Sequence, residues 1–217
     1  MIPFRTPEEV AAALPRVVTH LARKGLIAYP TETVYGFGTA ISAAAVDRLC
    51  ALKQREPGKP FLVLVAGRGM LAGMGLRLTD AAERFAAAFW PGPLTLVLPG
   101  GEGRVPDALR GPEGGVAVRW TSHPGAARII TTLGSPITST SANRTGEPSL
   151  MAASEIERRF GARVADGSLV VLDAGELHPS APSSLVDCTG PAPRLLREGA
   201  LPAATLRSMV PSLAGRP

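Results

Sequence analysis

Hydrophobic and polar residues recur with two different periods along the chain, and these periods predict both helices and strands. A helix is expected after Thr6, because Thr6-Pro7-Glu8-Glu9 supplies a capping hydroxyl, a proline at the first helical position and a glutamate three residues after the cap. Gly25 marks its end. The short apolar run 26–29, closed by Pro30, predicts a buried strand. Apolar residues recur at helical spacing inside the helix: Val10, Leu14, Val17, Val18 and Leu21.

The remainder of the chain continues this alternation after a loop at 31–39. Further helices are expected at 43–52, 81–89, 124–133 and 202–209, and another follows a capping box that starts at Ser154. Further strands are expected at 61–65, 95–98, 116–119, 137–139, 169–172, 184–187 and 194–197.

This order of elements predicts the fold class. Strands that alternate with helices are typical of an α/β core with a partly parallel sheet, and the late run of strands makes the sheet mixed. The expected fold is a single α/β domain with a twisted, open, mixed parallel and antiparallel sheet flanked by helices. The domain is expected to cover residues 1–210, and residues 211–217, which are terminal and rich in proline and glycine, to form a flexible tail.

Composition excludes several classes of protein. The 217 residues are 45% hydrophobic and 19% charged, which excludes a disordered, solvating chain. No apolar run reaches the roughly 18 residues of a membrane span, and the N-terminus lacks the apolar stretch of a signal peptide, so a cytoplasmic protein is expected. Two cysteines without a CxxC pair and three scattered histidines predict neither a disulfide scaffold nor a metal site. The net charge of +5 indicates a polyanionic partner, either phosphorylated small molecules or nucleic acid.

Polar residues concentrate in segments that follow apolar strands, which is where α/β sheets bind ligands. In the segment 29–38, Thr31 and Thr33 offer hydroxyls beside two glycines, although composition alone favours an ordinary turn there. In the segment 52–60, three cations fall within seven residues: Lys53, Arg55 and Lys59. Arg55 could bind a phosphate bidentately, and no Walker-type motif is present; the alternative is a solvated basic loop.

Two later segments extend this polar inventory. Thr138, Ser139, Thr140 and Ser141 are four consecutive hydroxyl residues followed closely by Asn143, more than a capping turn alone would explain. Ser183 opens one expected strand and Arg197 closes the next, so both could face one end of the sheet; for Arg197 the alternative is a surface arginine. Hydroxyls and cations with few bases suit a site that positions a phosphate-bearing substrate rather than one that supplies a covalent nucleophile.

Together these segments resemble the YrdC-like threonylcarbamoyl-AMP synthase family, in its short, single-domain form. Each motif is weak alone, but they run in the family's order from about residue 26 to residue 199. The matching pieces are Tyr29–Gly38, Lys53-x-Arg55 with Lys59-Pro60, Phe89–Thr95, Val116–Arg119, Ser141-Ala-Asn143, Pro182–Asp187 and Leu196-Arg197.

The resemblance implies a function as well as a fold. It implies that ATP and L-threonine bind on the concave, positively charged face of the sheet, with Mg²⁺ accompanying ATP. Threonine would combine with bicarbonate or CO2 to give a carbamate, which would attack the α-phosphate and release pyrophosphate. The product, threonylcarbamoyl-AMP, would pass to tRNA threonylcarbamoyl-transfer proteins that modify the adenosine beside the anticodon.

The resemblance also assigns roles to single residues. It implies no resident metal ligand. It assigns catalysis to Lys53 and Arg55, threonine binding to Thr33, Arg119, Ser139 and Ser183, and nucleotide binding to Arg55, Lys59, Gly115, Ser141, Asn143, Ser149 and Arg197.

Three positions depart from the family pattern. Leu64 stands where relatives often have a histidine, which removes an expected threonine contact. Lys59 stands where many members have asparagine, and Gly115 replaces a frequent threonine, so a nucleotide contact there would come from the backbone.

Other functions compete with synthesis. A basic RNA-binding module fits the net charge, but aromatic residues make up only 5% of the chain and do not interleave with basic ones; weak direct binding of tRNA or RNA stays open. A family paralogue without synthase activity is disfavoured by the intact Ser141-Ala-Asn143. A relative acting in carbamoyl transfer during metal-centre maturation is disfavoured because acylphosphatase-like and zinc-finger segments are absent.

Overall fold

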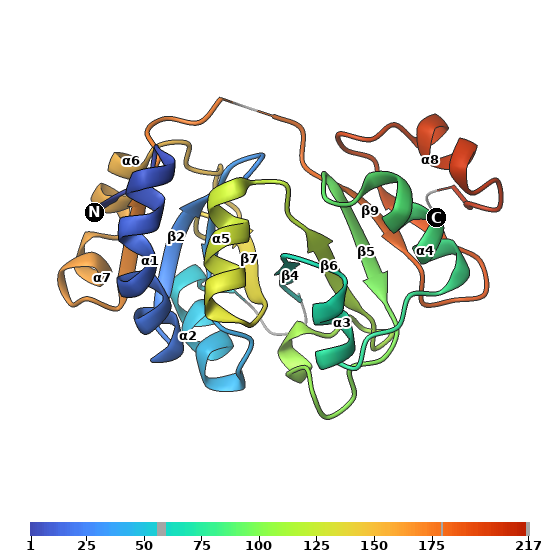
Figure 1. Cartoon of the computed structure of the whole chain (residues 1–217), viewed down its shortest axis with the longest axis horizontal. Coiled ribbons are helices and arrows are strands. Elements are labelled where there is room, and N and C mark those ends of the chain that lie inside the picture. The colour runs from blue at the N-terminus through green and yellow to red at the C-terminus, as the bar shows by residue number, and fades with distance from the viewer. Residues whose placement is uncertain (56–59, 179, 216–217) are drawn as a thin grey trace.

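A twisted mixed sheet runs through the computed structural model, which describes residues 1–55, 60–178 and 180–215 (Figure 1). Within these residues the sheet has ten strands in the order β1-β8-β2-β3-β7-β4-β6-β5-β9-β10. Four neighbouring pairs are parallel, namely β1/β8, β8/β2, β4/β6 and β5/β9, and the others are antiparallel. The predicted α/β class and mixed sheet are confirmed. The strands are β1 (Ile2–Pro3), β2 (Leu26–Pro30), β3 (Tyr35–Gly38), β4 (Leu62–Val65), β5 (Leu94–Leu98), β6 (Val116–Trp120), β7 (Ile137–Ser141), β8 (Leu169–Asp173), β9 (Ser184–Asp187) and β10 (Arg194–Arg197).

Helices flank the sheet, and their ends follow the capping signals in the sequence. Thr6 Oγ1 accepts a hydrogen bond from Glu9 N at 3.3 Å, and the Glu9 carboxylate accepts one from Thr6 N at 3.2 Å, as the capping box predicts. Gly134, at φ 68°, ends the predicted helix 124–133. The helices are α1 (Pro7–Ala22), α2 (Ala43–Lys53), α3 (Gly69–Gly73), α4 (Asp80–Phe89), α5 (Pro124–Leu133), α6 (Ala153–Arg159), α7 (Gly161–Ala165) and α8 (Ala203–Met209), with a 3₁₀ turn at Asp107–Leu109.

Strand β1 and helices α3 and α7 were not predicted, and three other segments differ from the sequence-based expectation. The expected loop 31–39 contains β3, which pairs with both β2 and β7. Helix α6 begins at Ala153 rather than after Ser154, because the Glu155 carboxylate accepts the backbone N–H groups of Met151 and Ala152 at 3.1 and 3.3 Å.

The expected flexible tail 211–217 also differs in its described part. Leu213 is 3% exposed, and the backbone of Ala214 exchanges hydrogen bonds with Pro193 and Leu195. Leu213 and Ala214 therefore attach this part of the chain to the rest of the fold, and a domain boundary at residue 210 stays a prediction.

In strands β2, β4 and β8, alternate residues enter two separate apolar cores, one on each face of the sheet. In β2, Ile27 and Tyr29 pack with α1 and α5, whereas Leu26 and Ala28 join the core that includes α2, α4 and α6. Helices α1 and α5 lie side by side across the first face (Figure 1). This period of two decides which side chains remain available on the first face where the helices do not cover it.

The first face of the sheet is covered by helices at one end of the strands and open at the other. Leu64 of β4 pairs with Ile137 of β7, and both are completely buried beneath α1 and α5. The next pair on the same face, Leu62 and Ser139, lines a cavity instead. The site therefore begins where the helical cover ends.

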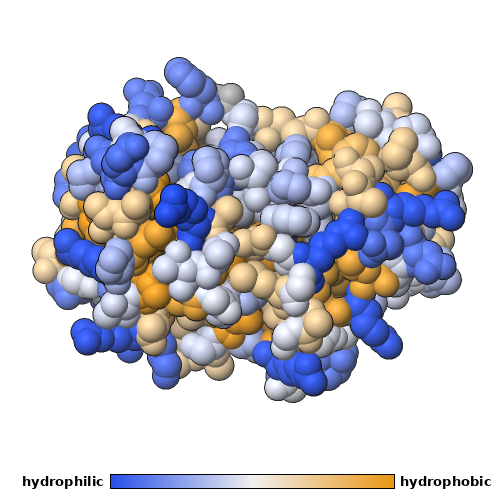
Figure 2. Space-filling model, in the orientation of Figure 1, coloured by the Kyte–Doolittle hydropathy of each residue, from blue (hydrophilic) through white to orange (hydrophobic). Residues whose placement is uncertain are grey.

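The outer surface carries polar and apolar side chains in a mixed pattern. Figure 2 shows strongly hydrophilic side chains spread over the face that carries α1 and α5, with apolar ones in separate small areas between them. Among the described residues, the large hydrophobic side chains that stand exposed are Met1 and Met209. None of the helices in the described ranges is long and apolar enough to cross a bilayer.

Candidate functional site

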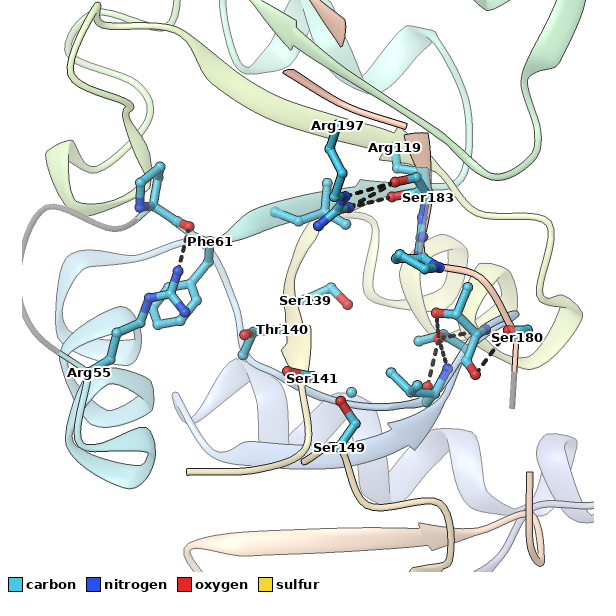
Figure 3. A pocket seen from close by; sticks show the side chains of 17 residues that line it. Arg55, Phe61, Arg119, Ser139, Thr140, Ser141, Ser149, Ser180, Ser183 and Arg197 are labelled. Atoms are coloured by element: carbon cyan, nitrogen blue, oxygen red, sulfur yellow. Dashed lines mark hydrogen bonds between the residues drawn. The ribbon is translucent and has the colours of Figure 1, made fainter. Parts of the chain in front are cut away.

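A cavity of about 560 Å³ opens on the face of the sheet beside α5 (Figure 3). Its walls come from the β2–β3 loop, the segment before β4, and strands β6, β7 and β10 with the segment that precedes β9. Within the described part of the chain, it brings together these predicted site residues: Thr33, Arg55, Arg119, Ser139, Ser141, Ser149, Ser183 and Arg197. Thr31, Phe61, Thr140 and Ser180 line it as well and were not among the predicted site residues.

The β2–β3 loop holds Thr33 in the cavity wall through a tight turn. Thr31 Oγ1 donates to Val34 O at 2.7 Å and accepts from Thr33 N at 3.2 Å. From outside the loop, Ser180 Oγ donates to the backbone oxygen of Thr33 at 3.1 Å. The ordinary-turn interpretation is therefore correct for Thr31, and the same turn places Thr33 against the cavity.

Arg119 supplies a nearly buried cation at one end of the cavity. Its side chain is 4% exposed, and Nη2 donates to Glu32 Oε2 at 3.3 Å. Its Nε is buried and has no hydrogen-bond partner within the described residues. A buried donor without a partner is costly, and an anionic ligand in this cavity could satisfy it.

Arg197 lies beside Arg119 and Ser183 (Figure 3). It donates from Nε and Nη2 to Ser183 O at 3.2 and 2.8 Å, and Ser183 Oγ lies 2.8 Å from Thr95 Oγ1. Burial, with the nearby charge of Arg119, lowers the pKa of Arg197. Two cations held this close together favour an anion between them.

Arg55 forms the opposite wall of the cavity in Figure 3. Its guanidinium lies 4.7 Å from the ring centroid of Phe61, and Nη2 donates to Pro60 O at 3.2 Å. Burial lowers its pKa as well. Stacking on the ring keeps the plane of the guanidinium in one orientation, which suits bidentate contact with phosphate.

Lys53 and Asn143 are not among the residues that line the cavity. Lys53 Nζ donates to Ser141 O at 2.6 Å and to both Asn143 O and Asn143 Oδ1 at 2.8 Å. Ser141 Oγ in turn donates to Asn143 Oδ1 at 2.7 Å. Burial, together with the charge of Arg55, lowers the pKa of Lys53 to about 8. Lys53 therefore anchors the turn that presents Ser141, from behind the cavity wall.

A second cavity of about 510 Å³ adjoins the first and contains Gly115. The two share lining residues Pro60, Leu62, Ser183 and Arg197. A Cβ at Gly115 would come within 2.6 Å of Thr189 Cγ2 and of Val97 Cγ1, so in this conformation the wall has no room for a side chain there. Lys59 lies outside the described residues.

Leu64 stays away from both cavities. It is completely buried in the core between the sheet and helices α1 and α5. The contact that a histidine was expected to make from this position is therefore replaced by apolar packing.

Glu32 is the functional candidate that sequence reasoning missed. It lies within the polar segment 29–38, but its ionised carboxylate is held behind Arg119 rather than in the cavity. Its signal in the sequence was a lone carboxylate in an otherwise neutral polar motif. The described residues contain no group of three or more His, Cys, Asp or Glu side chains arranged to hold a metal ion.

The fold and the cavity define an α/β protein with an open mixed sheet and an arginine- and hydroxyl-lined cavity on one face. Comparison with known proteins identifies its family. The model of the Sua5/YciO/YrdC family, described as "Telomere recombination", matches residues 19–199, and the chain belongs to this family.

Individual relatives support the same assignment. The chain is 36% identical over 197 residues to the threonylcarbamoyl-AMP synthase of Pyrococcus abyssi, covering 90% of this chain and 56% of that protein. It is 41% identical over 171 residues to the synthase of Chromohalobacter salexigens, covering 75% and 89% of the two chains. The crystal structure of P. abyssi Sua5 complexed with L-threonine matches all of this chain with a TM-score of 0.85 and 32% identity, over 62% of its own length. The chain thus spans little more than half of the P. abyssi protein.

Proposed function

We propose that the chain is a threonylcarbamoyl-AMP synthase, which makes L-threonylcarbamoyl-AMP from L-threonine, bicarbonate or CO2, and ATP. The observation that carries the proposal is the joining of two cavities, one lined by three arginines and a row of hydroxyls, the other largely apolar. Among the described residues, the first cavity has no carboxylate in its lining, which suits a substrate that bears several negative charges.

Threonine would occupy the end of the first cavity formed by Arg119. The buried guanidinium would bind the amino-acid carboxylate, since arginine matches a carboxylate with two parallel hydrogen bonds. Thr33, Ser139 and Ser183 line the same cavity and would hydrogen-bond the remaining polar atoms of threonine. The relative whose structure contains L-threonine supports this choice of amino acid.

The nucleotide would extend from the first cavity into the second. Arg55, Arg197, Ser141 and Ser149 would contact the phosphates, and the apolar walls around Gly115 would receive the base. Lys59 would add a cation to the phosphate side. Lys53 and Asn143 would act on the nucleotide indirectly, by holding Ser141.

The reaction needs positioning and charge stabilisation more than a base. The threonine amine would combine with CO2, releasing a proton to solvent, or with bicarbonate, releasing water, to give a carbamate. One carbamate oxygen would then form a bond to the α-phosphorus of ATP. The bond between that phosphorus and the bridging oxygen to the β-phosphate would break, and pyrophosphate would leave with the electron pair. Arg55 and Arg197 would stabilise the charge on the phosphates, and Mg²⁺ would arrive bound to the triphosphate.

The proposed product would place the protein in a cytoplasmic tRNA-modification process. Threonylcarbamoyl-AMP is a mixed anhydride whose acyl group can be transferred, so its consumer would be a tRNA threonylcarbamoyl-transfer protein. Direct contact with tRNA is not required by this chemistry.

The decisive experiment measures pyrophosphate release by the purified protein with ATP, bicarbonate and L-threonine. Release should depend on threonine, and mass spectrometry should identify threonylcarbamoyl-AMP in the same reaction. Reactions without threonine or without bicarbonate serve as controls. If no threonine-dependent pyrophosphate appears while the protein retains RNA on a filter at physiological salt, the chain is an RNA-binding module instead.

A further inference from the structure

Glu32 connects three parts of the molecule that lie far apart in the sequence. It belongs to the β2–β3 loop, and its Oε1 accepts hydrogen bonds from Thr121 Oγ1 at 2.9 Å and from Ser122 N at 2.8 Å. Its Oε2 accepts from Arg119 Nη2 at 3.3 Å. The loop that presents Thr33, the segment that leads into α5 and the cation of the cavity therefore meet at one carboxylate.

This carboxylate remains ionised although it is largely buried. Burial opposes ionisation of Glu32, but the charge of Arg119 and the hydrogen bonds from Ser122 and Thr121 outweigh it and lower the pKa. The groups that donate hydrogen bonds to Glu32 are thus one cation and neutral donors, and the titratable side chains of His123 and Tyr29 also lie near enough to interact with its charge. The surrounding donors replace the water that the Glu32 carboxylate would otherwise bind, and they hold the carboxylate in one position.

One nitrogen of the Arg119 guanidinium has a hydrogen-bond partner, and another has none. Nη2 is engaged with Glu32, whereas the buried Nε has no partner within the described residues. Arg197 stands close enough for the two cations to repel each other. Without an anion behind it, Arg119 would be driven to rotate toward solvent or away from Arg197, since a flexible side chain follows the local field.

We infer that Glu32 is a positioning residue for substrate binding: it fixes Arg119 from behind so that the open Nε edge faces the carboxylate of the bound amino acid. The inference rests on the proposed function, because it assumes that threonine occupies the Arg119 end of the cavity. Glu32 touches neither substrate in this arrangement and acts only through Arg119 and the β2–β3 loop.

Glu32→Gln separates the two connections that the carboxylate makes. The amide oxygen of glutamine can still accept from Thr121 and Ser122, so the loop stays attached. The amide NH₂ would then face the Arg119 Nη2 donor, and the hold on the guanidinium is lost. The Glu32→Gln variant should fold normally, and only the position of Arg119 at the threonine end of the cavity should change.

The expected result is a split between binding and turnover. Loss of a hydrogen bond to a charged group should raise the KM for threonine by about ten- to a hundredfold, and the dissociation constant for threonine measured by calorimetry should rise in parallel. The kcat at saturating threonine and the KM for ATP should stay within about threefold of wild type, because no group at the phosphates has changed.

Two further variants serve as controls. Glu83→Gln neutralises an exposed carboxylate that pairs with Arg68 on the surface, and should leave both KM values unchanged. Thr121→Val removes one donor to Glu32 Oε1 without touching the Arg119 contact, so it should lower the thermal midpoint while threonine binding changes much less than in Glu32→Gln.

The outcomes distinguish this inference from the proposed function. If wild type releases pyrophosphate with threonine but Glu32→Gln keeps the wild-type KM and dissociation constant, Glu32 does not position Arg119. If Glu32→Gln lowers kcat alone, the carboxylate acts on the reaction itself, and the inference is again wrong. If wild type shows neither threonine binding nor threonine-dependent pyrophosphate release, the proposed function is wrong, and the inference about Glu32, which rests on it, is wrong as well.

Discussion

Lys53 provides the sharpest test of how the cavity is built, because sequence and structure assign it different roles. The sequence predicts a catalytic residue, whereas the structure shows Nζ donating to Ser141 O, Asn143 O and Asn143 Oδ1 at 2.6 to 2.8 Å. Lys53→Met keeps a side chain of similar length and apolar stem but removes all three donors. The three oxygen atoms lose the ammonium donor, although Ser141 O keeps a hydrogen bond from Asn143 N and Asn143 Oδ1 keeps one from Ser141 Oγ.

The structure sets the size of the expected loss. Hydrogen bonds from a charged donor contribute about 1.5–3 kcal/mol each, but these three share one ammonium and offset its desolvation. The acceptors are neutral oxygens, and leaving a buried acceptor without its donor costs about 1–3 kcal/mol, so a loss of about 3 kcal/mol in the free energy of unfolding is expected. For a chain of this size that corresponds to a fall of about 6–12 °C in thermal midpoint. The KM for ATP should rise, because Ser141 is no longer held in the cavity wall.

The pH dependence of stability gives an independent check. Burial lowers the pKa of Lys53 to about 8 in the folded protein, whereas in the unfolded chain the pKa has its ordinary value of 10.5. Between these values the unfolded chain binds the extra proton, so this residue makes stability rise with pH. The difference in free energy of unfolding between wild type and Lys53→Met should therefore grow from pH 7.5 to about 10, as urea titrations would measure.

Arg84→Met, a change of an exposed cation on α4, is the matched control and should alter stability by less than about 0.5 kcal/mol. The reasoning is refuted if Lys53→Met unfolds within about 0.5 kcal/mol of wild type and yet has lost turnover with an unchanged KM for ATP. Lys53 would then contact the reacting groups, as the resemblance to the family implies.

Three other predictions follow from the site and the cores. Arg55→Ala should raise the KM for ATP and Arg119→Ala the KM for threonine in pyrophosphate-release assays, with both variants folded by circular dichroism; unchanged kinetics in both would mean that the site is misplaced. Leu64→Ala should cost about 2–5 kcal/mol in urea unfolding because it opens a space beneath α5, and should leave the KM for threonine within twofold, whereas a larger rise would mean that position 64 reaches the substrate. Leu213→Ala should lower the free energy of unfolding by about 2 kcal/mol, and a stability equal to wild type would support a flexible tail instead.

Helix ends and isolated strands were predictable because their signals are local. The helix Pro124–Leu133 has the predicted bounds, since proline at its start and a left-handed Gly134 at its end act within a few residues. Strands β9 and β10 also have the predicted bounds. Strand β3 was missed because Tyr35 and Phe37 alternate with glycines, and its extended form is decided by pairing with β2 and β7.

The sequence indicated which residues make up the candidate site, but it did not indicate how their side chains are arranged. Hydroxyls and arginines that follow strands on one face meet there, and the register of Leu62 with Ser139 brings two such segments together. The direction of Lys53 could not be read in the same way. It is the last residue of α2, and its acceptors lie 88 and 90 positions away in the chain, so only the sheet order determines that the ammonium points at them.

Lys53 and Glu32 illustrate one structural solution used at two ends of the cavity. In each case a buried charge outside the cavity holds a group that faces into it: Lys53 holds Ser141, and Glu32 holds Arg119. Each contact joins segments separated by more than 80 residues, so neither can form before the sheet is assembled. Folding therefore fixes the positions of these binding groups in advance, and substrate binding does not have to supply the free energy that orders them. A site made of hydroxyls and flexible arginines needs such fixing more than one built around a rigid metal centre, because its catalytic power depends on where the donors stand when the charge on the phosphate develops.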